Sequence, residues 1–210
     1  MTKDWLSWHD DYDRPGSALA ARLAEVREQV RAALDRAPTG PLRVVSACAG
    51  QGRDLIPVLA THPRRGDVTA RLVELDPRNV ALAKDAVRAA GLTGVQVVLG
   101  DAASTDAYAD LVPADLVLLC GVFGNVSDHD VRAIVGHCAA LCAGGGTVIW
   151  TRHRGEPDLV PTICDWFARE GFAQVALSTP AHRVGVGVHR LVGNSRPLPS
   201  SVTMFRFLPD

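Results

Sequence analysis

A glycine turn marks the part of this sequence that could do chemistry. It reads Ser46-Ala47-Cys48-Ala49-Gly50-Gln51-Gly52-Arg53-Asp54. Gly50 and Gly52 permit a tight turn, and the small side chains of Ala47 and Ala49 let a ligand approach the backbone. The helix expected to follow, which Asp54 can cap, exposes N–H groups that favour an anionic or carboxylate group. A purely structural turn is the alternative interpretation.

Two carboxylates follow the turn, each at the end of an apolar run. Glu74 lies about twenty residues past the glycines, where an acid can accept hydrogen bonds from both hydroxyls of a ribose. Asp101 follows the next apolar run, where it can accept from an exocyclic amine such as that of adenine, beside the backbone N–H of Ala102. The structural alternatives are a surface acid for Glu74 and a helix N-cap for Asp101.

The elements that position these residues alternate between strand and helix. Strands are expected at 42–47, 69–75, 95–99, 116–120, 147–150, 172–177 and 184–192, with 202–208 as one more. Helices are expected at 17–36, 54–61, 77–90, 104–111, 127–142 and 157–170. Strands that are apolar throughout are buried on both faces, as in a parallel sheet covered by helices. Ligands bind at the carboxyl ends of such strands, where the turn and both acids fall.

This pattern predicts an α/β fold. We expect a Rossmann-like, doubly wound, mostly parallel seven-stranded sheet, with an antiparallel edge hairpin near the C-terminus and an N-terminal helical extension. Residues 1–40 are expected to form a lid or helical extension, and residues 41–210 the ligand-binding domain. The helix ending at 142 is expected to stop at a cap formed by Gly144, Gly145 and Gly146.

Composition excludes several classes of protein. The 210 residues carry a net charge of −1 and are 47% hydrophobic. A nucleic-acid partner is not expected without a basic excess. No apolar run is long enough to span a membrane and no targeting signal is evident, so we expect a soluble, cytoplasmic protein. The five cysteines, without a Cys-x-x-Cys pair, are interpreted as reduced core thiols rather than a metal site.

Together, these motifs resemble the class I S-adenosylmethionine (SAM)-dependent methyltransferases over about residues 40–190. The family's glycine loop matches residues 46–52, its ribose acid Glu74 and its adenine-side acid Asp101, while residues 115–122 resemble its fourth-strand motif. The resemblance implies SAM as cofactor and S-adenosylhomocysteine (SAH) as product. It implies that SAM is bound by Ala47, Ala49, Gly50, Gly52, Arg53, Glu74, Leu75, Asp101, Ala102, Gly121 and Val122.

Two residues depart from the family pattern. Ser46 stands where the family has an acid, and Cys48 stands where it has its first glycine. An acid among residues 10–13 could instead meet the amino end of SAM. The family's Asn/Asp-Pro-Pro-Tyr/Phe signature is absent after the fourth strand, which argues against methylation of adenine bases or glutamine side chains.

The acceptor is expected above the ends of the fourth and fifth strands, with an aromatic N-terminal segment as a lid. His153 is the candidate general base, with a solvated or capping histidine as the alternative. Candidate acceptor-binding residues are Trp8, Tyr12, Phe123, Asn125 and Arg152. For Trp8 the alternative is simple packing on the domain edge, and for Arg152 a solvated basic turn.

The function predicted from the sequence is transfer of a methyl group from SAM to an oxygen, nitrogen or carbon atom of a small molecule. A non-catalytic SAM-binding module and an NAD-dependent oxidoreductase are the alternatives. The oxidoreductase is disfavoured because the glycine spacing is not Gly-x-Gly-x-x-Gly and no Tyr-x-x-x-Lys pair occurs. The oligomeric state is left open, with a homodimer as one option.

Overall fold

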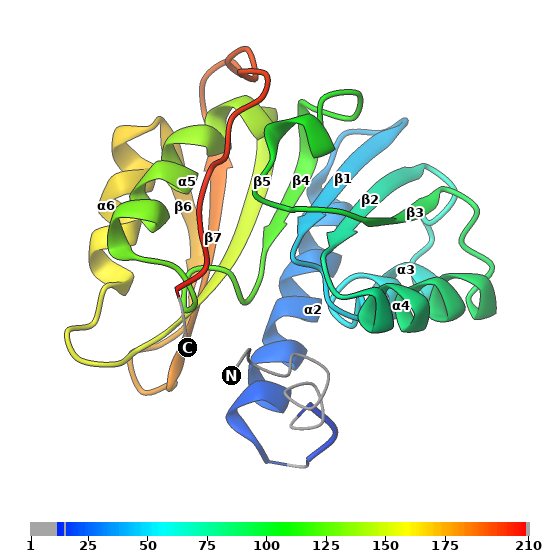
Figure 1. Ribbon diagram of the computed structural model, residues 1–210, viewed down its shortest axis with the longest axis horizontal. Coiled ribbons are helices and arrows are strands. Elements are labelled where there is room, and N and C mark those ends of the chain that lie inside the picture. The colour runs from blue at the N-terminus through cyan, green and yellow to red at the C-terminus, as the bar shows by residue number, and fades with distance from the viewer. Residues whose placement is uncertain (1–11, 15, 209–210) are drawn as a thin grey trace.

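Seven strands form one sheet in the computed structural model, which describes residues 12–14 and 16–208 (Figure 1). The spatial order is β3-β2-β1-β4-β5-β7-β6. The bounds are β1 Leu42–Ala47, β2 Val68–Glu74, β3 Val95–Leu99, β4 Ala114–Leu119, β5 Cys142–His153, β6 Phe172–Leu177 and β7 Val184–Leu191. The predicted Rossmann-like sheet is confirmed.

Strand direction places a switch point between β1 and β4. Strand β1 pairs in parallel with both β2 and β4, and the chain crosses from one half of the sheet to the other between them. Strand β7 is antiparallel to β5 and to β6, which makes β6–β7 the predicted edge hairpin. Ligands of open α/β sheets bind outside the strand ends at such a switch point.

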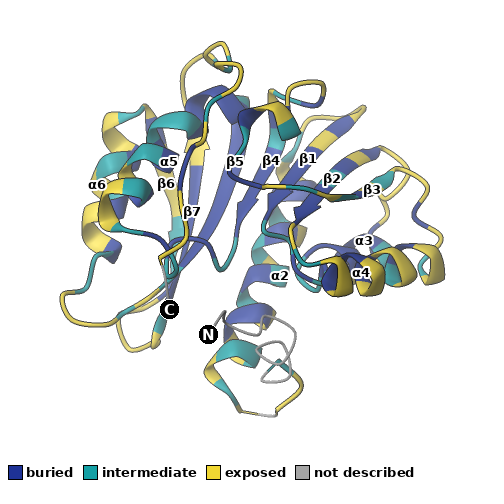
Figure 2. Cartoon of the chain, viewed as in Figure 1, coloured by how far each residue is buried: buried dark blue, intermediate teal, exposed yellow. Residues whose placement is uncertain are grey.

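Helices cover both faces of the sheet. Helices α2 (Ala18–Arg36), α3 (Ile56–Thr61) and α4 (Pro77–Ala89) contribute to one apolar core, which includes Val30, Leu59 and Ala83. Helices α5 (Asp128–Leu141) and α6 (Val160–Arg169) contribute to the core on the other face. The central strands β1, β2, β4, β5 and β7 are mostly buried, whereas the edge strands β3 and β6 are only partly buried (Figure 2). No helix in the described part of the chain has the length and apolar character needed to cross a bilayer.

Helix starts follow the local sequence. The side chain of Ser17 accepts a hydrogen bond from the Ala20 N–H, Asp76 accepts from Arg78, and Ser127 accepts from Asp130. Each side chain satisfies an N–H that has no partner within its own helix. The cap predicted at Asp54 is not formed, because Leu55 is the N-cap of α3 and makes no side-chain hydrogen bond.

Three expectations about the later elements are wrong. Helix α5 ends at Leu141 without a glycine cap, because Gly144–Gly146 lie within strand β5, where the register against β4 shifts. Only a 3-10 turn, η2 (Thr105–Ala107), forms in the region 104–111. Residues 202–208 form no strand of the sheet. They make isolated bridges from Thr203 to Ser104 and from Phe207 to Val126.

Residues 202–208 instead form what we call the C-terminal strap. The strap runs along the face that carries α5 (red in Figure 1). Met204 and Phe205 are buried in the core, and the Met204 N–H donates to the Ala103 carbonyl at 2.8 Å. The strap therefore covers sheet surface between the loops that follow β3 and β4, where the β3–β4 connection supplies only η2.

Candidate functional site

The turn after β1 has a left-handed backbone at three positions: Cys48 (φ 51°), Gly50 (φ 54°) and Gly52 (φ 67°). Its ends are held by hydrogen bonds from the Ala49 N–H to the Val73 carbonyl and from the Gly52 N–H to the Ala49 carbonyl. A Cβ at Gly52 would lie 2.5 Å from the Cδ1 of Ile56. Only glycine combines this conformation with this close approach of the turn to α3.

Glu74 joins the end of β2 to this turn. Glu74 is only 8% exposed, and its Oε2 accepts a hydrogen bond from the Gly50 N–H at 2.8 Å. Its Oε1 accepts from the Asp76 N–H at 2.9 Å. Each carboxylate oxygen has two lone-pair sites, so both retain the capacity to accept a bond from a ligand hydroxyl.

The loop after β3 lies beside Glu74. Leu99 is the register partner of Glu74, and the Gly100 N–H donates to the Glu74 carbonyl at 3.0 Å. The exposed Asp101 caps its own loop, with Oδ1 accepting from the Ala103 N–H. Burial, followed by the charges of Glu74 and Asp101, raises the pKa of the Cys48 thiol, which places this thiol near both acids. The three loops therefore converge, as the sequence predicts.

The loops after β1, β2 and β3 together border the region that we call the crevice. Two exposed leucines complete this end of it. Leu75 is 64% exposed and Leu99 is 56% exposed. Ala102 is buried, and its carbonyl accepts a hydrogen bond from the hydroxyl of the buried Tyr108 at 2.8 Å. Large apolar side chains exposed beside carboxylates form a surface suited to a flat ring with a polar edge.

The loop after β4 is fixed by hydrogen bonds. The N–H of Gly121 (φ 83°) donates to Oγ1 of Thr151, and its carbonyl accepts from the Asn125 side chain at 2.6 Å. Val122 and Phe123 are both fully buried. The Phe123 ring packs on Trp150 with centroids 5.6 Å apart, so its structural role is core packing.

Arg152 and His153, at the end of β5, lie against the β4 loop. The guanidinium of Arg152 donates to the Phe123 carbonyl and to Asp128. His153 is exposed, and its Nδ1 accepts from the Gly155 N–H at 3.2 Å. A Cβ at Gly124 would lie 3.1 Å from the His153 ring, so the two loops are in close contact.

The start of the described chain docks on the glycine turn. Asp13 accepts two hydrogen bonds from Arg53, at 2.7 and 3.0 Å. The Tyr12 ring lies 5.2 Å from the guanidinium carbon of Arg22 and 5.8 Å from that of Arg53, within cation–π range. Trp8 lies outside the described residues.

A buried charged group beside the turn is missed by the sequence reading. Arg22 of α2 is 8% exposed, and its guanidinium interacts electrostatically with Cys120 and Asp54. Burial lowers the pKa of Arg22 and raises the pKa of Asp54. The available signal was the spacing of Arg22, Val26 and Val30, four residues each, which places the arginine on the apolar face of the helix.

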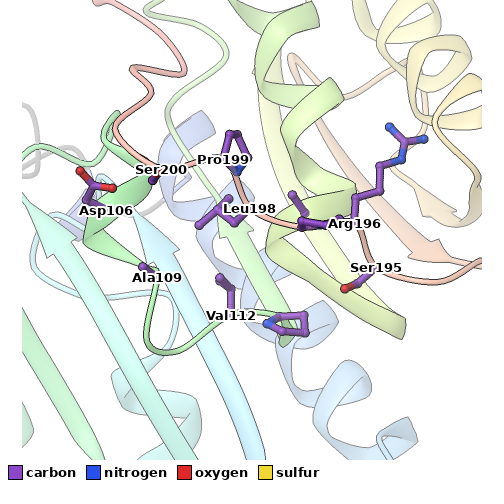
Figure 3. A pocket seen from close by; sticks show the side chains of 11 residues that line it. Asp106, Ala109, Val112, Ser195, Arg196, Leu198, Pro199 and Ser200 are labelled. Atoms are coloured by element: carbon purple, nitrogen blue, oxygen red, sulfur yellow. The ribbon is translucent and has the colours of Figure 1, made fainter.

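A pocket of about 460 Å³ lies elsewhere, between η2, the residues before β4 and the segment 195–200 (Figure 3). Val112 and Pro113 place it at the amino end of β4, away from the crevice. The carboxylate of Asp106 accepts bonds from the N–H and hydroxyl of Ser201, and Arg196 pairs with Glu170. Its charged groups therefore have partners within the chain, and we assign it no function.

A protein-family model described as "Putative methyltransferase" matches residues 17–174 of this chain. This stretch begins at the N-cap of α2 and includes every loop of the crevice. A search of curated proteins finds no match to the sequence.

Several solved methyltransferase structures share the fold. Magnesium protoporphyrin IX methyltransferase from Synechocystis PCC 6803, with bound SAM, superposes with a TM-score of 0.67 at 15% identity, covering 90% of this chain and 91% of that one. An O-methyltransferase family protein from Burkholderia thailandensis superposes with a TM-score of 0.66 at 19% identity, covering 89% of this chain and 59% of that one. The CurJ carbon methyltransferase superposes with a TM-score of 0.63 at 12% identity, covering 90% of this chain and 58% of that one. This chain thus spans less than two thirds of the last two proteins.

Proposed function

The chain belongs to the family described as "Putative methyltransferase", and from this premise we propose that it binds SAM and transfers its methyl group to a small-molecule acceptor. The transfer is an in-line displacement onto an oxygen, nitrogen or carbon atom. Residues 1–40 act as a lid and helical extension, and residues 41–210 form the SAM-binding domain. The docking of Tyr12 and Asp13 on Arg53 supports this division.

The observation that carries the proposal is the junction of Gly50, Glu74 and Leu99. The Glu74 carboxylate holds the turn through the Gly50 N–H and keeps lone pairs for two ribose hydroxyls. Leu75 and Leu99 offer apolar surface to an adenine ring. Asp101 then lies where it can accept from the adenine amine, beside the backbone N–H of Ala102. The residues present therefore fit an adenosyl group.

SAM, when bound, supplies a methyl group that is activated by a positively charged sulfur. The residues of this chain contribute orientation, and holding two reactants in line can supply roughly 7–11 kcal/mol of barrier reduction. The fixed β1 turn would set the position of the methyl carbon. The loops after β4 and β5 would then set the direction from which the acceptor approaches.

On the acceptor side we assign contact roles to Asn125, His153 and Tyr12, with Phe123 and Arg152 supporting the loop from beneath. Because His153 Nδ1 accepts from Gly155, the proton of the neutral ring resides on Nε2. Nε2 can therefore donate to the acceptor and orient it. The alternative role of general base requires the His153 ring to leave the Gly155 N–H and turn its unprotonated Nδ1 toward the acceptor, where Nδ1 takes up the acceptor's proton.

Calorimetry with SAM and SAH tests the cofactor assignment. The wild-type protein should bind both, and Glu74→Ala should weaken binding by about 1–3 kcal/mol, or roughly 5- to 150-fold, because the ribose loses a charged hydrogen-bond partner. Glu28→Ala removes an exposed glutamate of α2 and serves as the matched control. Unchanged affinity in a folded Glu74→Ala variant would remove the ribose assignment.

A labelled-methyl assay tests catalysis. The protein is incubated with methyl-labelled SAM and a fractionated metabolite extract, and transfer into a small-molecule fraction is the expected result. Tight SAM binding without transfer to any fraction would favour the non-catalytic module. Transfer into an RNA or protein fraction instead would contradict the acceptor class.

A further inference from the structure

We propose that Arg22 and Asp54 bind the amino-acid end of SAM. In this arrangement the guanidinium of Arg22 donates to the α-carboxylate of the ligand, and the carboxylate of Asp54 accepts from its α-ammonium group. The proposal rests on the proposed function, since it concerns the part of the same ligand that the adenosyl crevice does not hold.

Three elements bring this charged group together. Arg22 comes from α2, Asp54 from the turn after β1 and Cys120 from the end of β4. The Cys120 thiol and the Arg22 guanidinium both affect the pKa of Asp54, which places the three side chains close together. The group therefore lies at the β1/β4 switch point.

Asp54 has unused hydrogen-bonding capacity in this group. Its Oδ1 atom is buried, and no donor among the described residues bonds to it. Burial is the main cause that raises the pKa of Asp54, opposed by the nearby backbone amides and by Arg22. A buried acceptor without a donor destabilises the folded protein. An ammonium group, with three N–H donors and a positive charge, would supply what Oδ1 lacks.

The charges of the ligand end complement those of the protein. An amino-acid group carries one ammonium and one carboxylate, and the pair of Arg22 and Asp54 offers one guanidinium and one carboxylate to match them. Binding therefore adds no net charge to a buried region, which limits the desolvation cost. The Tyr12 ring lies over Arg22 and Arg53 and forms a wall on the outer side. Strand β1 contains no acid that could bind the ammonium group in place of Asp54, because the buried polar residue near its end is Ser46.

The position also fits the adenosyl crevice. Asp54 belongs to the same turn as Gly50, whose N–H is held by Glu74, and Cys120 directly precedes Gly121. The ligand would lie along the strand ends, with its adenosine over β2 and β3 and its amino-acid end over β1 and β4. Its sulfur would then lie between, facing the loops of the acceptor side.

Four ligands, compared in two pairs whose members differ at this end, test the assignment by calorimetry. SAH carries the whole amino-acid group and 5′-methylthioadenosine lacks it, while decarboxylated SAM keeps the amine and is compared with SAM. Asp54→Asn preserves shape and removes the charge, and Arg22→Met removes the guanidinium. Asp85→Asn and Arg31→Met, at exposed positions on α4 and α2, are the matched controls.

Asp54→Asn is expected to weaken SAH binding about 10-fold or more and to leave 5′-methylthioadenosine binding within about 2-fold. Arg22→Met should weaken SAM by a similar factor but spare decarboxylated SAM, whereas Asp54→Asn should weaken both. Glu74→Ala should weaken all four ligands. This pattern would assign the carboxylate to Arg22 and the ammonium to Asp54.

Two other outcomes overturn the proposal. Equal weakening of all four ligands, together with a lower melting temperature, would show that the pair only holds α2 in place. Unchanged SAH affinity in both folded variants would show that the amino-acid end binds elsewhere. If the wild type binds neither SAH nor 5′-methylthioadenosine, the proposed function itself fails, and this result is distinct from both.

Discussion

His189 of β7 is a buried ionisable residue that the proposed chemistry does not use. It is 1% exposed and stacks on Phe167, with ring centroids 4.5 Å apart. Its Nδ1 accepts a hydrogen bond from Nε1 of Trp150 at 3.1 Å. Burial lowers the pKa of His189 to about 4. The histidine is therefore neutral in the folded protein at neutral pH, and this has a consequence for stability.

Unfolding free energy should fall as the pH is lowered from about 6.5 to about 4. In this range the unfolded chain binds a proton at His189 and the folded chain does not, so acid favours unfolding. The loss amounts to about 3 kcal/mol for a shift from 6.5 to about 4. His189→Gln keeps an acceptor for Trp150 and should remove this part of the pH dependence. Urea denaturation of both proteins across the range measures it, and parallel curves would contradict the assignment.

The sequence predicts the location of a site residue well where that residue directly follows a strand. Glu74 and Asp101 follow apolar runs, and the structure brings both to the glycine turn as expected. Their binding roles remain predictions. For Arg22 the spacing with Val26 and Val30 is only a weak signal, because an arginine beside an apolar stripe is usually solvated. Its burial depends on how α2 docks against β5, β7 and α3, which only the assembled fold decides. The sequence predicts that Arg152 contacts the acceptor, whereas in the structure its guanidinium is bonded to the β4 loop and to Asp128.

Among the elements, the C-terminal strap makes a clear prediction about stability. Phe205 is 3% exposed, whereas Phe207, its edge-to-face partner at 5.6 Å, is 40% exposed. Phe205→Ala should cost about 3–5 kcal/mol, because it leaves a cavity under the strap. Phe207→Ala, the matched control, should cost no more than about 1.5 kcal/mol. Chemical denaturation compares them, and similar losses would show that the strap does not cover the core as described.

Elements with a simple local signal were predicted well. Strands β1, β3 and β6 have the predicted bounds. Strand β5 was underestimated because its pairing continues through glycines that usually end a helix. The strap was mistaken for a strand because its apolar residues face the core. Its hydrogen bonds go to loops at Ala103 and Asn125, and these tertiary partners leave no trace in the strap's own sequence.

For the whole molecule, the crevice joins parts of the chain that are far apart in sequence. Its proposed ligand contacts come from α2 and from the loops after β1, β2, β3 and β4. A ligand that bridges them binds the folded chain and not the unfolded one. At 100 times its dissociation constant, SAH should stabilise the fold by about 2.7 kcal/mol and raise Tm by about 5–10 °C. Differential scanning calorimetry measures this shift. A Tm that does not change, despite binding at 25 °C, would mean that the unfolded chain binds SAH as well, which contradicts a site assembled only by the folded chain.

The overall architecture followed from the sequence because strand–helix alternation and fully apolar strands leave few alternatives. The insertion of β7 between β5 and β6 was predicted only as a hairpin at one edge, since pairing order is a property of the assembled sheet. The same holds for the two cores, which become separate only when the sheet lies between them.

The left-handed backbone at Cys48 has a consequence for the kinetics of ligand capture. A non-glycine residue is held in this conformation only where its surroundings enforce it. Here the Ala49 N–H bond to Val73 and the Gly50 N–H bond to Glu74 fix the turn on either side. The ordering cost of the turn is therefore met during folding, before any ligand arrives. The first, bimolecular step in the capture of SAM should therefore need no rearrangement of this turn, and its observed rate should rise linearly with SAM concentration.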